Sequence, residues 1–131
     1  MRLTFLGLLL GALPAVAHHS FAAEYDEKKS VKVTGIVKKV EWTNPHSRMY
    51  LDVKGPDGKI TTWNFEFGSP NHLFRAGWTR NTVKEGDQIT VEGWAAKDGT
   101  NLAQTREITL ADGKKVPGFA GAQDSGGAPT Q

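Results

Sequence analysis

The sequence predicts an all-β domain, a small five-stranded barrel of the OB type with one short helix between strands 3 and 4. Three observations lead to this prediction. Apolar and polar residues alternate over five segments, turns containing Gly or Pro separate these segments, and a short helical stretch interrupts the series after the third segment. Five strands with a helix at that position follow the order of the OB fold. An open five-stranded sandwich of similar content is the alternative.

The first predicted strand covers residues 31–42 and changes phase along its length. Val33 belongs to one apolar row, whereas Ile36 and Val40 belong to the other, and Gly35 lies at the change. A glycine at such a change is typical of a β-bulge, which bends a long strand where a barrel closes. We therefore expect one long and bent strand.

The second and third strands form a hairpin whose register follows from the pattern. A loop of two or four residues would put their apolar rows on opposite faces, whereas a three-residue loop at 56–58 brings the rows together. Pro56 and Asp57 suit a type I turn, and Gly58 suits the left-handed position that follows it. The predicted pairs are Met49 with Phe65, Leu51 with Trp63 and Val53 with Thr61.

One short helix is expected after the third strand. Ser69 is a candidate N-cap, Pro70 suits the first helical position and Gly77 suits the end. These three positions together predict a helix of about two turns, placed where the OB fold carries its helix.

The last two strands are expected at residues 86–94 and 102–110. A two-residue turn between them would pair Ile89 with Ile108. Residues 117–131 are rich in Gly, Ala and polar residues and have no apolar periodicity. Such a composition predicts a disordered tail.

The first 17 residues have the order of a cleavable export signal. A short positive start precedes an apolar run and an Ala-Val-Ala cleavage sequence. The run is shorter than the about 20 residues that span a bilayer, which disfavours the alternative of an uncleaved membrane anchor. Cleavage after Ala17 would give a mature chain that begins at His18, with a flexible segment at 18–30 and the barrel at 31–116.

Composition and motifs narrow the function classes. The chain has no cysteine, so packing must stabilise it without disulfides. Its net charge is +2, or +1 once Arg2 is removed, and its basic residues are scattered. Nucleic-acid binding needs a clustered positive charge, which this charge distribution does not provide, so we expect no nucleic-acid partner. The sequence has no G-x-S-x-G, phosphate-loop or H-E-x-x-H motif, and we predict a monomeric, non-enzymatic protein without catalytic residues.

Four histidines are the main candidates for chemistry. His18 and His19 would begin the mature chain, His46 precedes the second strand and His72 lies in the first turn of the helix. The hairpin register places His46 opposite Gly68, close in sequence to the helix. We therefore expect His46 and His72 to lie near each other at one end of the barrel, where the flexible start of the mature chain can join them.

A terminal histidine suggests Cu(II) as the ligand of this site. The terminal amine and the ring of His18 would chelate one copper ion in a brace that a second imidazole completes. A rival geometry uses the amine with the amide nitrogen and the ring of His19. Nitrogen-rich square sites suit Cu(II), which can displace the proton of a terminal amine with a pKa of about 7.7–8.0. The alternative is that the four histidines are structural.

A second function class is a partner- or glycan-binding module that needs no metal. It would use the barrel face and exposed aromatic residues such as Tyr50 and Trp94 to bind an envelope protein or a glycan. Packing in the core is the alternative for aromatic residues of this kind.

Several segments resemble a known family. They are the His-His-Ser-Phe segment at 18–26, the segment 35–46 that ends in Asn-Pro-His, Gly-Trp-Thr-Arg at 77–80 and the segment 86–93. Together they resemble a family of small secreted proteins of Gram-negative bacteria, catalogued as a domain of unknown function, family 6152. The resemblance implies a periplasmic location and a small β-barrel-like domain, and it supplies no activity.

Overall fold

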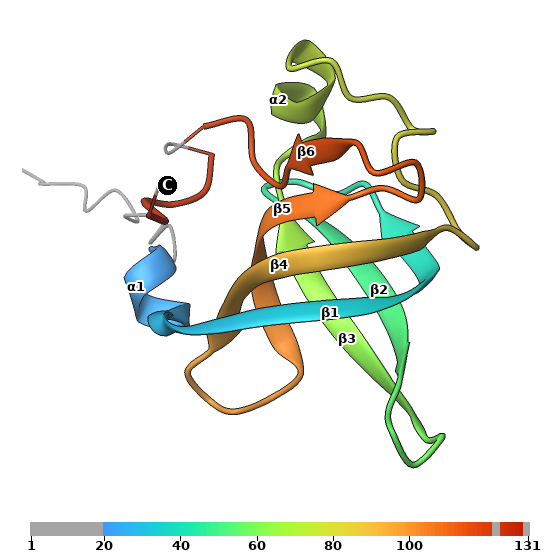
Figure 1. The fold of residues 1–131 in the computed structure, drawn as a ribbon. Helices are drawn as coiled ribbons and strands as arrows, with labels where there is room; N and C mark the ends of the chain where they lie inside the picture. The colour runs from blue at the N-terminus through green and yellow to red at the C-terminus, as the bar shows by residue number, and fades with distance from the viewer. Residues whose placement is uncertain (1–19, 122–123, 130–131) are drawn as a thin grey trace, which may run out of the picture.

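The computed structural model describes residues 20–121 and 124–129, which form a barrel flanked by short helices (Figure 1). No helix in these two ranges is long and apolar enough to cross a membrane. In chain order the elements are α1 (Phe21–Glu24), β1 (Tyr25–Glu41), β2 (Ser47–Lys54), β3 (Ile60–Phe67), α2 (Pro70–Arg75), β4 (Gln88–Ala96), β5 (Leu102–Thr109) and β6 (Lys115–Pro117).

The strand order is that of a closed five-stranded OB-type barrel. Neighbouring strands run β3-β2-β1-β4-β5-β6, and β3 also pairs with β5 in parallel, which closes the ring. The helix α2 lies between β3 and β4 in the chain, with Pro70 at its start and Gly77 beyond its end at φ +98°. The predicted fold class is therefore confirmed. The short strand β6, which pairs with β5, was not predicted.

The long strand β1 pairs with two neighbouring strands and is bent between them. Its first part pairs with β4 and its second part with β2, and the register with β2 shifts between Val37 and Lys39. The bulge therefore lies just after the position that the phase change suggested. Val37 is buried, whereas Ile36 of the second apolar row is 44% exposed. Gly35 is needed instead because a Cβ there would collide with the carbonyl oxygen of Asp52.

The β2–β3 hairpin has the predicted register. Gly58 has a φ of +80°, and the N–H of Gly55 donates to the carbonyl of Lys59 at 2.8 Å. The apolar rows of both strands therefore lie on the inner face. The observed pairs include Met49 with Phe65, Leu51 with Trp63 and Val53 with Thr61.

The β4–β5 hairpin differs from the prediction by two residues. Val91, and not Ile89, lies opposite Ile108. The turn spans residues 97–101, and a register shift between Glu92 and Gly93 moves the pairing further. The sequence pattern did not reveal this shift, because both registers put apolar residues on the inner face.

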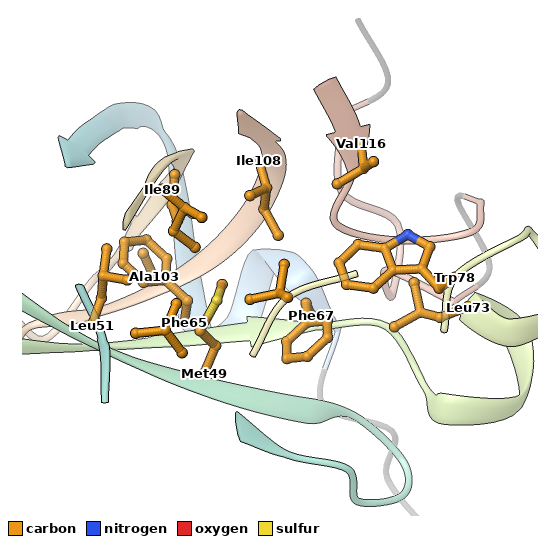
Figure 2. Packing of buried hydrophobic residues seen from close by; sticks show 13 residues of the cluster. Met49, Leu51, Phe65, Phe67, Leu73, Trp78, Ile89, Ala103, Ile108 and Val116 are labelled. Atoms are coloured by element: carbon orange, nitrogen blue, oxygen red, sulfur yellow. The ribbon is translucent and has the colours of Figure 1, made fainter. Parts of the chain in front are cut away.

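The main core fills the barrel between the two sides of the sheet. Figure 2 shows its side chains converging from the strands, with Leu73 and Trp78 beside Phe67 at the α2 end. A second, smaller cluster lies outside the barrel next to α1. Its buried members are Phe21, Tyr25, Trp94, Ala96 and Ala128.

Both segments expected to be flexible contain ordered structure. Residues 21–24 form α1, and β1 begins at Tyr25 rather than near residue 31. Beyond β6, residues 118–121 and 124–129, here called the C-terminal strap, run back along the barrel towards α1 (Figure 1). Asp124 and Ala128 are buried, so the prediction of a disordered tail is wrong for this part of the chain. Backbone and polar contacts, which composition does not reveal, hold this Gly-rich segment.

Candidate functional site

The structure brings His46 and His72 to one residue, Asp124 of the C-terminal strap. Nε2 of His46 lies 2.8 Å from the carbonyl oxygen of Asp124, and Nδ1 of His72 lies 2.9 Å from its Oδ1. The N–H of Ser47 donates to the carbonyl of Gly68, so the start of β2 lies beside the chain that leads into α2. This contact holds the two histidines at the same end of the barrel, as the hairpin register predicts.

His46 has an acceptor at each ring nitrogen. Its Nδ1 lies 3.2 Å from Oε1 of Glu66, opposite the bond from Nε2 to the carbonyl of Asp124. A carboxylate and a carbonyl accept hydrogen bonds, so the ring satisfies both acceptors when it is the imidazolium cation. In agreement, the hydrogen bond to Glu66 raises the pKa of His46 against the opposing effect of burial.

Glu66 is a buried carboxylate with two cationic neighbours. It is 5% exposed, and Arg48 approaches its Oε2 at 3.4 Å on the side opposite His46. Burial acts to raise the pKa of Glu66, but the hydrogen bonds and positive charges around it outweigh burial and lower that pKa. Burial, together with the charge of Glu66, raises the pKa of the adjacent Tyr25 hydroxyl. Glu66 is therefore ionised and His46 is its partner.

His72 differs from His46, because only one of its two ring nitrogens makes a hydrogen bond within the described residues. Its side chain is 50% exposed, and within the described ranges no hydrogen bond is made by its Nε2. Oδ1 of Asp124 also accepts from the backbone N–H of Ser69 at 3.3 Å. A pocket of about 360 Å³ opens beside His72 and Asp124. The carboxylate favours a hydrogen on Nδ1, and in that neutral tautomer Nε2 presents its lone pair.

The other two predicted ligands, His18 and His19, lie outside the described residues. The N–H of Phe21 donates to the carbonyl of Gly126 at 3.0 Å, two residues beyond Asp124. The described chain therefore starts beside the strap. Among residues 20–121 and 124–129, no three His, Cys, Asp or Glu side chains are grouped as a metal site.

The aromatic face of the alternative function is only partly present. Trp94 is 9% exposed and packs edge-on against Phe21 with ring centroids 5.2 Å apart, so the prediction that Trp94 is exposed is wrong. α1, which the sequence did not suggest, covers it. Tyr50 is half-buried on the outer face, where its hydroxyl donates to Glu41 at 3.4 Å and Nζ of Lys39 lies 6.0 Å from its ring.

Two residues of the site were missed by sequence reasoning. Glu66 could have been found, since the correct hairpin register already puts it opposite Arg48. Asp124 could not, because its contacts with His46 and His72 join segments 78 and 52 residues apart in the sequence.

Fold and site define a small OB-type barrel with a cluster of histidines and carboxylates at one end. The chain belongs to the family of unknown function DUF6152, whose model matches residues 7–105. None of the curated proteins matches the sequence.

Two solved structures with similar folds are crystal forms of Rim1, a mitochondrial single-stranded DNA binding protein of S. cerevisiae. They are 17% and 19% identical to this chain, each with a TM-score of 0.48, and the match covers 63% of this chain and 93% and 92% of theirs. These neighbours contradict the expectation that excluded a nucleic-acid partner on net charge, and we withdraw that exclusion. A net charge near zero does not describe the charge of one face. At this TM-score the likeness does not indicate what this chain binds.

Proposed function

We propose that this protein is an exported, non-enzymatic domain that binds Cu(II) between its mature terminus at His18 and the side chain of His72. The observation that carries the proposal is the bond from Nδ1 of His72 to Asp124, which leaves Nε2 free beside a pocket. The bond from Phe21 to Gly126 supports it, because the mature terminus would lie only three residues before Phe21.

The chemistry of this donor set suits copper. The amine and ring of His18 supply two nitrogens, and Nε2 of His72 supplies a third, which is the nitrogen-rich set that Cu(II) prefers. A carboxylate on the other ring nitrogen makes a histidine a stronger and better oriented ligand. His19 stays an alternative ligand through its amide and ring. His46 leaves the proposed set, because both of its nitrogens already donate inside the protein.

The proposal requires export to the periplasm and cleavage after Ala17. A cut at that bond creates the amine of His18, and a cut elsewhere removes it. Protein recovered from the periplasm should therefore have a mass that begins at His18. A different first residue would contradict the terminal part of the site.

The binding test is a Cu(II) titration followed by electron paramagnetic resonance. The mature protein should bind one copper tightly, and His72→Ala should weaken binding at least tenfold and change the nitrogen coupling. One extra residue before His18 should remove tight binding. His19→Ala separates the two geometries, because it should retain tight binding in the brace and weaken it where the ring of His19 is a ligand. Unchanged affinity in His72→Ala would reduce the site to a terminal chelate. Wild-type binding no tighter than that of the variant lacking all four histidines would overturn the proposal.

A further inference from the structure

Three successive carbonyls of the C-terminal strap are each bound by a different part of the barrel. Nε2 of His46 donates to the carbonyl of Asp124 at 2.8 Å. The next carbonyl, of residue 125, accepts from the side-chain amide of Gln104 at 2.9 Å. The third, of residue 126, accepts from the backbone N–H of Phe21 at 3.0 Å. Residues 124–126 form a turn, in which Gly126 has a φ of +66° and the N–H of Ser125 donates to the carbonyl of Gly121 at 3.1 Å. The barrel thus binds this turn through its main chain.

The first residue of this triplet also has a pocket for its side chain. The carboxylate of Asp124 is 8% exposed and accepts from the backbone of Ser69 and from Nδ1 of His72. Gly68 forms the wall, and a Cβ there would lie 2.5 Å from Oδ2 of Asp124. The pocket therefore binds the Oδ1 of a carboxylate and requires glycine beside Oδ2, which is buried without a hydrogen-bond partner within the described residues.

The strap binds this groove with little apolar contact of its own. Apart from Phe119 and Pro129, its described residues are Gly, Ala, Ser and Asp. Ala128 is its buried apolar side chain, and Phe119 is partly buried. Ordering such a segment costs backbone entropy at every residue, so a Gly-rich segment with few apolar contacts is held weakly.

The groove also contains polar groups that the strap does not satisfy. Oε1 of Gln104 and Oγ1 of Thr105 are buried, and neither has a hydrogen-bond partner within the described residues. A space of about 170 Å³ remains beside Thr105, lined also by Trp94 and strap residues. A segment with a donor at this point would fit the groove better than the strap does, because an unpaired buried acceptor destabilises the complex.

We propose that the groove under the C-terminal strap is a binding site for an acidic, turn-forming segment of a partner protein, and that the strap is its built-in competitor. The segment has an aspartate followed by two small residues, which are the features that the groove recognises in Asp124, Ser125 and Gly126. The proposal goes beyond copper binding, and its groove runs from Ser69 and His72, which contact Asp124, to Phe21 of α1. A tethered strap competes at an effective concentration in the millimolar range, so the wild-type groove binds a free peptide weakly.

The test uses a fluorescein-labelled synthetic peptide with the sequence of residues 118–129 and the full mature chain carrying Asp124→Ala. EDTA is present, so that the result does not depend on the copper proposal. The peptide should bind the Asp124→Ala protein at least tenfold more tightly than it binds wild type, measured by fluorescence anisotropy. The same peptide with Ala in place of its Asp should bind at least tenfold more weakly.

Hydrogen exchange of residues 118–129 reports whether the strap has left the groove. If the strap of Asp124→Ala remains protected, Asp124→Lys replaces it, because a cation cannot occupy the pocket next to His72. A folded variant with an exchanging strap and no peptide binding would overturn the proposal. So would equal binding of the Asp and Ala peptides, or a strap that stays protected in both variants. Dimers in which copies exchange straps would also overturn it, since the occupant would then be a second copy.

Discussion

At the scale of single residues, His46 links the barrel to the strap through its charge. Both ring nitrogens donate, one to a buried carboxylate and one to a neutral carbonyl. When the ring loses a proton, the hydrogen that remains stays with the carboxylate of Glu66, because a bond to an ionised acceptor is the stronger one. The bond to the carbonyl of Asp124 is then lost. His46 is thus a point where pH acts on the strap.

The sign of this pH effect follows from the raised pKa of His46. A group whose pKa is higher in the folded state stabilises fully below its unfolded pKa, about 6.5 for histidine, and loses the effect as pH rises through its folded pKa. We therefore predict that the strap is protected at pH 6 and loosens as the pH rises above the His46 pKa. Hydrogen exchange, corrected for intrinsic rates, measures this.

The matched variants for this test are His46→Ala and Glu66→Gln. His46→Ala should remove the pH dependence of strap protection in this range. Glu66→Gln should shift the midpoint to lower pH, because it removes the carboxylate that raises the His46 pKa. An unchanged pH profile in His46→Ala would mean that another group governs the strap.

At the scale of elements, close contacts between backbones fix how the strands cross. β4 passes so close to β5 that a Cβ at Gly93 would collide with the carbonyl oxygen of Gln104. The colliding atom belongs to the backbone of a central strand and cannot rotate away. This contact lies next to the register shift between Glu92 and Gly93. The β4–β5 register therefore depends on glycine at this position.

We predict that Gly93→Ala destabilises the protein by about 1–3 kcal/mol or more, the usual cost of overpacking. Gly121→Ala is the matched control, because a Cβ there meets nothing within 4 Å. It should change the free energy of unfolding by no more than about 0.5 kcal/mol. Urea unfolding followed by tryptophan fluorescence compares the two. Equal stability of both variants would contradict the account of the β4–β5 contact.

At the scale of the whole molecule, one apolar interior stabilises the barrel without disulfides. Phe65 lies in β3 with no exposed surface, on the strand that pairs with β2 on one side and β5 on the other. Ile60 begins the same strand and is 65% exposed. The two positions therefore differ mainly in burial and make a matched pair.

Phe65→Ala should lower the free energy of unfolding by about 3–5 kcal/mol, because it leaves a cavity in the core. Ile60→Ala should change it by no more than about 0.5 kcal/mol. Thermal unfolding monitored by circular dichroism measures both. A small loss in Phe65→Ala would mean that the core repacks around the missing ring.

Local chemistry allowed the sequence by itself to determine much of this protein. The five barrel strands, the short helix and the β2–β3 register follow from period-two patterning and from turn residues only a few positions apart. The same register brought His46 close to α2, which explains why the meeting of His46 and His72 was predictable. Where the pattern was ambiguous, at Ile36 and along β4–β5, both solutions kept apolar residues inside.

Only the tertiary structure decided the rest of the site. Burial of Trp94 depends on α1, and the role of Asp124 depends on partners 52 and 78 residues away in the sequence. A Gly-rich segment carries no periodicity, so its composition predicts disorder even where the folded barrel offers donors to its carbonyls. Those donors come from the start of β2, from β5 and from α1, and they form one groove only once the barrel has closed.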